Sequence, residues 1–370
     1  MPDLRARAVP TERPGRRHRR LAAVAAVALL VLAPACSDDG GDEAGGDERS
    51  STTTAPEAPD APEPEPSGGC GQGDDAEVSL EERTLDVRSA PRRFLVTAPQ
   101  QPADGEPLPL VLDFHGLAEG ANIHAQMTQL GPLGIAEGFV TVFPHGTGEP
   151  VRWNTAIDPA ANADLEYVGA VLDQVEADRC IDTSRVYATG LSNGAMMSSA
   201  VACTMADRIA AVAPIAGVMF PDGCAPSRPV PLYTVHGTAD PILLFNGGVG
   251  GAVLDRALGG GDDAGATTTT TTAPADLDGA GYPETVRRWA DALECEDPGD
   301  EEVSDEVIRR SYDCPDGTEL VFDIVEGGGH SWPSSEFSKS IGDIVGPTTF
   351  DIDASEELWR FVSRFRLPPG

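Results

Sequence analysis

The stretch Arg185-Val186-Tyr187-Ala188-Thr189-Gly190-Leu191-Ser192-Asn193-Gly194 is the part of this sequence on which the interpretation of the rest depends. Its first half is a short, mostly apolar run that predicts a buried strand, and the small residues at 195–206 predict a buried helix. A strand that enters a helix through Gly-x-Ser-x-Gly makes a tight turn, because glycine on both sides lets the backbone pass closely. Such a turn raises the serine hydroxyl above the sheet. Ser192 is therefore the candidate nucleophile, and a serine in an ordinary strand-to-helix turn is the alternative.

Predicted strands and helices alternate on both sides of this turn. Residues 77–87 and 93–98 alternate polar and apolar side chains, which predicts an antiparallel hairpin at the edge of a sheet. Buried strands are predicted at 110–116, 138–143, 185–189, 211–217, 230–237 and 319–325. Helices are predicted at 121–136, 162–175, 195–206, 284–293 and 354–365. The pattern indicates an α/β protein with a mostly parallel, doubly wound sheet and helices on both faces. With the Ser192 turn, it predicts the α/β-hydrolase fold.

A serine nucleophile needs a base that removes its proton and an acid that orients the base. In the α/β-hydrolase fold these residues follow one another as Ser, Asp or Glu, and His. His236 ends a predicted strand four residues before Asp240, so it cannot follow the acid. His330, in a glycine-rich loop after the strand at 319–325, is left as the base. Asp240 is the predicted acid, and an ordinary Asp-Pro turn is the alternative for this residue.

Backbone N–H groups are expected to stabilise the oxyanion of such a site. Asn193 directly follows the nucleophile and supplies one donor. The loop after His115-Gly116 supplies the other, through Leu117. His115 itself is interpreted as a structural residue that shapes this loop.

Taken together, these motifs resemble the polyhydroxybutyrate depolymerase and feruloyl esterase family of secreted α/β-hydrolases. The motifs that carry the resemblance are His115-Gly116, Trp153-Asn154, Gly190-Leu191-Ser192-Asn193-Gly194, His236-Gly237-Thr238-Ala239-Asp240 and Gly328-Gly329-His330-Ser331-Trp332-Pro333. The resemblance covers about residues 85–365, apart from an insertion at 247–281. It implies carboxylester hydrolysis without a cofactor, with Ser192, Asp240 and His330 as the triad. Family members usually have a second glycine where Ala195 stands here.

The substrate stays open at this point among three classes: poly(3-hydroxybutyrate) or its oligomers, feruloyl esters of plant polysaccharide, and acetylated xylan. Trp153 and Trp332 are candidates for stacking on an aromatic acyl group or a sugar, with packing in the core as the alternative. A function of another class is a non-catalytic surface lipoprotein built on a hydrolase fold.

The two ends of the chain differ from its middle. Residues 1–35 contain a basic region, an apolar run and Ala33-Pro34-Ala35, which predict an export signal. Cleavage there leaves Cys36 either as a lipidated first residue or as an ordinary exported residue. Residues 36–76 are rich in Asp, Glu, Gly, Pro, Ser and Thr, which predicts a disordered acidic tether. The esterase domain is predicted at 77–370, and its insertion at 247–281 is interpreted as a disordered loop, with a functional lid as the alternative.

The sequence contains seven cysteines, and setting Cys36 aside leaves an even number, which favours lipidation of Cys36 and disulfides among the others. This places the protein outside the cell, anchored to the outer face of the membrane. Several connectivities are open, and the preferred pairs are Cys203–Cys224, Cys295–Cys314 and Cys70–Cys180. The formal charge of −34 makes nucleic acid an unexpected partner. No motif indicates a metal site or a phosphate-binding loop, and a monomer is expected.

Overall fold

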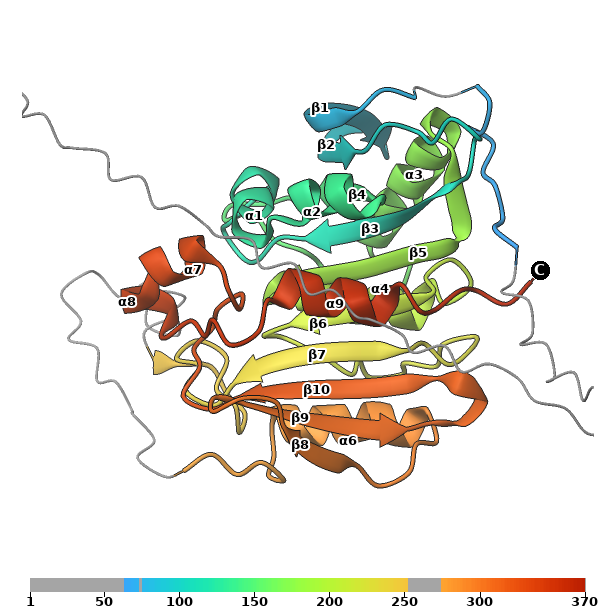
Figure 1. Ribbon diagram of the computed structural model, residues 1–370. Helices are drawn as coiled ribbons and strands as arrows, with labels where there is room; N and C mark the ends of the chain where they lie inside the picture. The colour runs from blue at the N-terminus through green and yellow to red at the C-terminus, as the bar shows by residue number, and fades with distance from the viewer. Residues whose placement is uncertain (1–62, 73–74, 252–273, 370) are drawn as a thin grey trace, which may run out of the picture. The chain divides into compact units, whose positions relative to one another are not determined.

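The computed structural model describes residues 63–72, 75–251 and 274–369 (Figure 1). The predicted export signal at 1–35 and the predicted lipidation site Cys36 lie outside the described residues. Within the described ranges, none of the helices is both long enough and apolar enough to span a membrane.

A ten-stranded sheet forms the centre of the fold, with strand order β1-β2-β4-β3-β5-β6-β7-β10-β9-β8 (Figure 1). The strands are β1 (Val78–Val87), β2 (Ala90–Ala98), β3 (Leu108–Phe114), β4 (Val140–Pro144), β5 (Ile181–Leu191), β6 (Ala211–Ile215), β7 (Leu232–Gly237), β8 (Gly299–Glu302), β9 (Val307–Asp313) and β10 (Glu319–Val325). The central run β4-β3-β5-β6-β7-β10 is parallel throughout, whereas the pairs at both ends are antiparallel. The carboxyl ends of the central strands therefore meet at one edge, where ligands bind in open α/β sheets.

Helices cover both faces of the sheet. They are α1 (Ala121–Thr128), α2 (Leu130–Glu137), α3 (Ala163–Asp178), α4 (Asn193–Thr204), α6 (Tyr282–Ala292), α7 (Glu336–Ser340), α8 (Gly342–Val345) and α9 (Ala354–Val362). Apolar side chains of α3, α4 and α6 pack in one core cluster, and those of α1, α2 and α9 pack in a second cluster. In Figure 1, α9 crosses the near face and α6 lies behind the sheet. The predicted α/β-hydrolase fold, with a mostly parallel sheet between helices, is confirmed.

The predicted helix at 121–136 is divided in two. Gln129 adopts a left-handed conformation (φ 54°) between α1 and α2. Pro132 explains the break, because a proline has no N–H to donate to the carbonyl one turn earlier. A single helix through this segment was therefore the wrong prediction.

Strands β8 and β9 were not predicted, because neither has a clear apolar pattern. β9 contains Arg309 and Arg310, which break its alternation. Arg309 donates to Asp323 at 2.6 Å, and Arg310 donates to Asp300 at 2.8 Å. Carboxylates from other strands thus compensate the two cations, and this compensation cannot be deduced from a local pattern.

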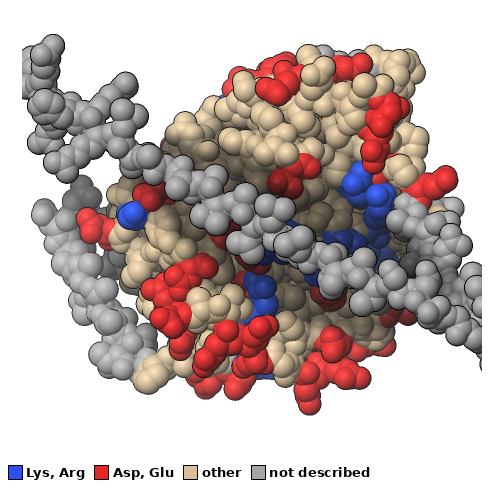
Figure 2. Space-filling model, in the orientation of Figure 1, with Lys and Arg blue, Asp and Glu red and all other residues tan. Residues whose placement is uncertain are grey.

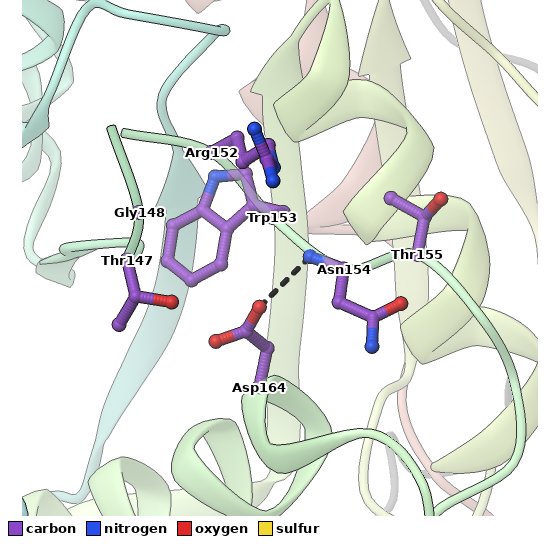
Figure 3. Close-up of a pocket in the computed structure, with 7 residues that line it drawn as sticks. All are labelled: Thr147, Gly148, Arg152, Trp153, Asn154, Thr155 and Asp164. Carbon is purple, nitrogen blue, oxygen red and sulfur yellow. Dashed lines mark hydrogen bonds between the residues drawn. The ribbon is translucent and has the colours of Figure 1, made fainter. Parts of the chain in front are cut away.

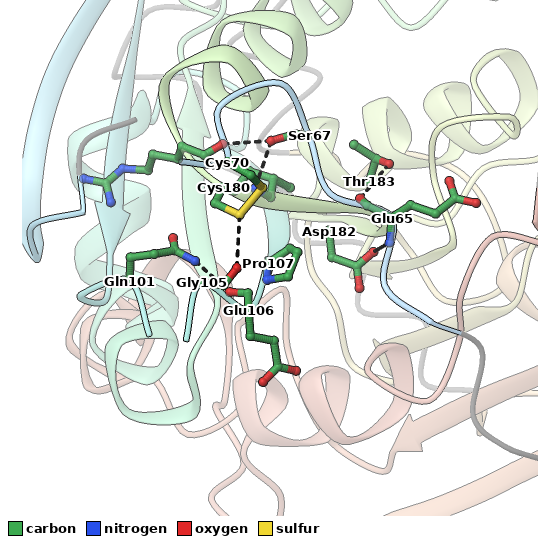
Figure 4. Close-up of a disulfide and its surroundings, with 12 residues drawn as sticks. Glu65, Ser67, Cys70, Gln101, Gly105, Glu106, Pro107, Cys180, Asp182 and Thr183 are labelled. Atoms are coloured by element: carbon green, nitrogen blue, oxygen red, sulfur yellow. Dashed lines mark hydrogen bonds between the residues drawn. A yellow bond between two sulfur atoms is a disulfide. The ribbon is translucent and has the colours of Figure 1, made fainter. Parts of the chain in front are cut away.

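Disulfides join Cys70 to Cys180, Cys203 to Cys224 and Cys295 to Cys314, the pairing preferred from the sequence. Figure 4 shows the first of them. The first disulfide holds residues 63–72 against the start of β5, where the Ser67 N–H donates to the Ile181 carbonyl at 2.8 Å. The Glu65 N–H donates to the Asp182 carboxylate at 3.0 Å. Residues 63–72 were assigned to the tether, so the folded part begins earlier than the predicted boundary at residue 77.

The predicted insertion at 247–281 is ordered at both of its ends, whereas its middle, 252–273, lies outside the described residues. Asn246 anchors the second end through its side chain, which donates to the Asp276 carbonyl at 2.7 Å and accepts from the Asp276 N–H at 2.9 Å. Arg310 donates to the Asp278 carboxylate at 2.8 Å. A disordered loop over the whole range was the wrong prediction, because polar contacts rather than apolar periodicity hold these ends.

Candidate active site

Ser192 lies in the turn between β5 and α4, with φ 57° and ψ −118°. A positive φ is strained for a residue with a side chain and is found most often at functional turns. The Ser192 N–H donates to the Ile215 carbonyl of the neighbouring strand at 3.0 Å, which fixes the turn to the sheet. Strand, strained serine and helix together have the geometry of a nucleophile elbow.

The glycines of this turn leave no room for a side chain. A Cβ atom on Gly194 would overlap the backbone of Phe114, and one on Gly190 would overlap the same carbonyl group. We expect Gly194→Ala to lower the free energy of unfolding by about 1–3 kcal/mol, because backbone atoms cannot move aside as a flexible side chain can. The measurement is urea unfolding followed by circular dichroism.

Ala195→Gly is the matched control in the next position of α4. It removes a methyl group instead of adding one, and the loss of helix propensity alone costs about 1 kcal/mol. A Gly194→Ala protein as stable as the wild type would show that the turn can relax, and the steric argument would then be wrong.

The predicted acid and base are in direct contact. His330 Nδ1 lies 2.7 Å from Asp240 Oδ2, and both residues are buried. Asp240 Oδ1 accepts hydrogen bonds from the backbone N–H groups of Ile242 (2.8 Å) and Leu243 (2.9 Å). Burial opposes ionisation of Asp240, but the hydrogen bonds from His236 and His330 hold the pKa of its carboxyl well below the usual range. The ionised, fixed carboxylate favours a proton on His330 Nδ1, which leaves Nε2 to act as an acceptor.

A second imidazole, that of His236, also contacts the acid. Its Nε2 lies 3.2 Å from Asp240 Oδ2 and 2.9 Å from the Leu243 carbonyl oxygen. Its ring stacks on Tyr282, with 3.6 Å between the ring centroids. Sequence reasoning excluded His236 as the base but missed this contact, because the spacing of His236 and Asp240 alone does not show that the loop folds back.

Ser192 and His330 lie on neighbouring loops at the same edge of the sheet. Gly217, after β6, packs on the Ser192 backbone so closely that a Cβ there would lie 2.9 Å from the Ser192 Cα. The adjacent Ala216 lines a small cavity together with Gly329 and Ser331, the two neighbours of His330. Within the described residues the Ser192 hydroxyl makes no hydrogen bond.

The loop after β3 is fixed around His115. Its Nδ1 donates to the Gly116 carbonyl at 2.7 Å, and its Nε2 accepts from the Gly146 N–H at 2.9 Å. Burial lowers the pKa of His115 to about 4, so the ring is neutral at pH 7. The Gly116 carbonyl and the Leu117 N–H belong to one trans peptide and point in opposite directions. Among the described residues the Leu117 N–H has no acceptor, as an oxyanion donor requires.

A buried charge network supports this loop, and sequence reasoning missed it. His124 Nε2 lies 2.7 Å from Asp113 Oδ1, and His124 Nδ1 lies 2.9 Å from Glu119 Oε1. The second oxygen of Glu119 accepts from the Gly116 N–H at 2.6 Å. Burial opposes the charge on His124, but the two carboxylates outweigh it and raise its pKa to about 10. The signal available in the sequence was an aspartate inside an otherwise apolar strand.

We expect His124 to be an imidazolium at pH 8, because its pKa in the folded protein lies above the ordinary value of 6.5. Its contribution to stability is then fully present below about pH 6.5 and is lost as the pH rises through about 10. The measurement is a two-dimensional NMR spectrum of protein with ¹⁵N-labelled histidine. One ring with both nitrogens protonated at pH 8 is the expected result, and the His124→Gln spectrum assigns it. Neutral rings throughout would contradict the charge network.

Comparison with known proteins agrees with this geometry. Residues 95–253 match the family model described as esterase PHB depolymerase. This range includes Ser192 and Asp240, and the similarity is to esterases of the polyhydroxybutyrate depolymerase and feruloyl esterase family. The bifunctional acetylxylan esterase/xylanase XynS20E of Neocallimastix patriciarum is 35% identical over 156 residues, which are 42% of this chain and 22% of the relative. The relative named "Putative esterase NocK", from Nocardia uniformis subsp. tsuyamanensis, is 29% identical over 296 residues, 78% of this chain and 83% of the relative.

Feruloyl esterase B of Piromyces equi is 24% identical over 284 residues, 75% of this chain. The chain thus spans about half the length of that relative (46%) and less than a quarter of XynS20E (22%). Among solved structures, an acetyl xylan esterase from Aspergillus awamori aligns with 72% of this chain and 98% of its own, at 15% identity and a TM-score of 0.49.

The two tryptophans that were candidates for stacking on the substrate are both buried. Trp332 is 1% exposed, and its Nε1–H donates to the Ser355 hydroxyl at 3.0 Å. Trp153 is 3% exposed, and its Nε1–H donates to the His115 carbonyl at 2.9 Å. This burial favours the alternative of packing in the core for both rings, and stacking of either ring on the substrate stays a prediction.

A cleft of about 500 Å³ lies around Trp153 and Asn154 (Figure 3). Its lining is mostly polar and consists of Thr147, Gly148, Arg152, Trp153, Asn154, Thr155 and Asp164. The Trp153 N–H donates to the Asn193 side-chain oxygen at 2.7 Å, which connects this wall to the residue after the nucleophile. The residue after the candidate nucleophile therefore contacts one wall of the cleft.

Proposed function

We propose that this protein is a serine carboxylester hydrolase with Ser192, His330 and Asp240 as its triad. The observation that carries the proposal is the buried 2.7 Å hydrogen bond between His330 and Asp240, at the same sheet edge as the strained Ser192 turn. Similarity to an esterase family agrees with it.

In the proposed mechanism the Ser192 hydroxyl attacks the ester carbonyl while its proton passes to His330 Nε2. The N–H groups of Asn193 and Leu117 stabilise the negative oxygen of the tetrahedral intermediate. The C–O bond to the alcohol breaks, and His330 returns the proton to the leaving alcohol. Water then attacks the acyl-enzyme by the same route, which releases the acid and restores the serine.

A fluorophosphonate probe tests the nucleophile directly. We expect the probe to label Ser192 in the wild type and to leave the Ser192→Ala protein unlabelled, because only an activated serine reacts with it. A wild-type protein that takes up no label would favour the non-catalytic surface lipoprotein.

The substrate is proposed to be a polysaccharide-linked ester or a hydroxyacid oligomer. Relatives named acetylxylan esterase and feruloyl esterase support the first class, and the family model named for polyhydroxybutyrate depolymerase supports the second. Parallel assays on acetylxylan, methyl ferulate and hydroxybutyrate oligomers decide between them. Hydrolysis of none of the three would exclude these classes.

We infer that the protein works outside the cell, since its three disulfides need an oxidising compartment. Cleavage of the signal at 1–35, a lipid on Cys36, a tether that carries the esterase domain and a monomeric state are further parts of this proposal. Mass spectrometry of the mature amino terminus tests the lipid, and an unmodified Cys36 would show free secretion instead.

A further inference from the structure

Arg152, in the wall of the polar cleft, has a guanidinium group without any partner among the described residues. Each of the other described arginines, and Lys339, uses its side chain in an ion pair or a hydrogen bond. The chain contains 60 acidic against 26 basic residues, and acidic side chains form several patches on the face in Figure 2. A shortage of carboxylates therefore does not explain the unpaired Arg152.

Neither Asp164, which lines the same cleft, nor Glu149, which lies three residues earlier in the chain, pairs with Arg152. Asp164 is committed elsewhere, because it accepts from Arg92 at 2.9 Å and from the Asn154 N–H at 2.8 Å (Figure 3). Glu149 is exposed and forms no ion pair with a described residue. The Arg152 guanidinium is thus available to a ligand in the cleft.

The backbone of Arg152 is held beside the proposed oxyanion donors. Its N–H and carbonyl pair with Thr147 at 2.9 and 3.1 Å. The preceding carbonyl, of Val151, accepts from the Ala118 N–H at 2.8 Å. The following N–H, of Trp153, donates to the Asn193 side chain. Arg152 therefore stands between one contact to the neighbour of Leu117 and one contact to the side chain of Asn193.

We infer that Arg152 is a specificity-determining residue that binds a carboxylate of the substrate, so that the preferred substrates are esters with a free carboxylate. The inference rests on the proposed esterase function. A guanidinium matches a carboxylate with two parallel hydrogen bonds, and the threonines and Asn154 in the cleft offer further polar partners. The carboxylate belongs either to the acyl part or to the alcohol part of the ester.

Matched ester pairs test the inference and separate these two sources. For the acyl part the pair is 4-nitrophenyl hemiglutarate and its methyl ester, and for the alcohol part it is 4-acetoxyphenylacetate and its methyl ester. We expect the wild type to favour the anionic member of one pair in kcat/KM, and Arg152→Gln to reduce that ratio about tenfold, the effect of losing an exposed charge-assisted contact. Added salt is expected to lower the ratio in the wild type and not in the variant.

Arg360→Gln is the matched control, because it removes an exposed cation on α9 that pairs with Glu357. Its anionic-to-neutral ratios are expected to equal those of the wild type. An unchanged ratio in Arg152→Gln, or an equal loss with both members of each pair, would overturn the inference. If the wild type hydrolyses none of the four esters and reacts with no fluorophosphonate, the esterase proposal itself is wrong.

Discussion

Replacing Ser192 with alanine is expected to lower kcat for 4-nitrophenyl acetate by about 10³- to 10⁶-fold, with little change in stability. The reason is chemical, because no other hydroxyl stands in the strained turn whose geometry favours attack on a carbonyl. The oxyanion donors and the cleft stay in place, so a small rate above that of water persists. Steady-state kinetics of the wild type and the variant measure kcat, and thermal unfolding of both proteins measures stability.

Ser198→Ala is the matched control on α4. It removes a buried serine hydroxyl that donates to the Gly194 carbonyl at 3.1 Å and is not proposed to take part in the chemistry. We expect kcat of this variant to stay close to the wild-type value. A Ser192→Ala protein with wild-type activity, or an equal loss in Ser198→Ala, would eliminate Ser192 as the nucleophile.

Replacing Asp240 with asparagine is expected to lower kcat by about 10⁴-fold, as replacing the acid does in other triads. Asp240 Oδ1 accepts two backbone N–H groups, so the asparagine must keep its oxygen there and turn its NH₂ group toward His330. That group donates to His330 Nδ1 and forces the ring proton onto Nε2. His330 then cannot accept the serine proton. The measurement is kcat over a range of pH.

The direction in which stability changes with pH follows from the lowered pKa of Asp240. Its contribution to stability is present above the pKa of an unfolded aspartate and is lost only as the pH falls through the lower folded value. The Asp240→Asn protein should therefore lose less stability than the wild type as the pH falls. Asp353→Asn is the control, because Asp353 caps α9 and asparagine caps about as well. A kcat within tenfold of the wild type would exclude Asp240 as the acid.

Much of the fold could be predicted because its signals are local. The apolar runs that became β3, β5, β7 and β10 are buried strands with turn residues at their ends, and the Gly-x-Ser-x-Gly turn needs no distant contact to be identified. The order of serine, acid and histidine along the chain then selected Asp240 and His330, which the structure brings to 2.7 Å. The cysteine pairs were only preferred among several open connectivities, and the structure forms the preferred pairs.

Distant contacts account for what could not be predicted. Whether a tryptophan faces solvent or the core depends on what packs over it, and Trp332 is covered by segments far away in the sequence, including Ser355. The charge of His124 depends on Asp113 and Glu119, which approach it only after β3 and α1 have packed. Residues 63–72 have no apolar pattern and are ordered by their contacts with β5.

The amino-acid sequence by itself determined the strands other than β8 and β9, the serine turn and the candidate triad, because periodicity, glycine placement and residue order act over short distances. Only the tertiary structure decided which charges are paired and which are free. Arg92, Arg309 and Arg310 form ion pairs with carboxylates from other elements, whereas Arg152 forms none with a described residue. Since pairing is a matter of distance in space, this difference among identical residues cannot be deduced from their positions in the chain.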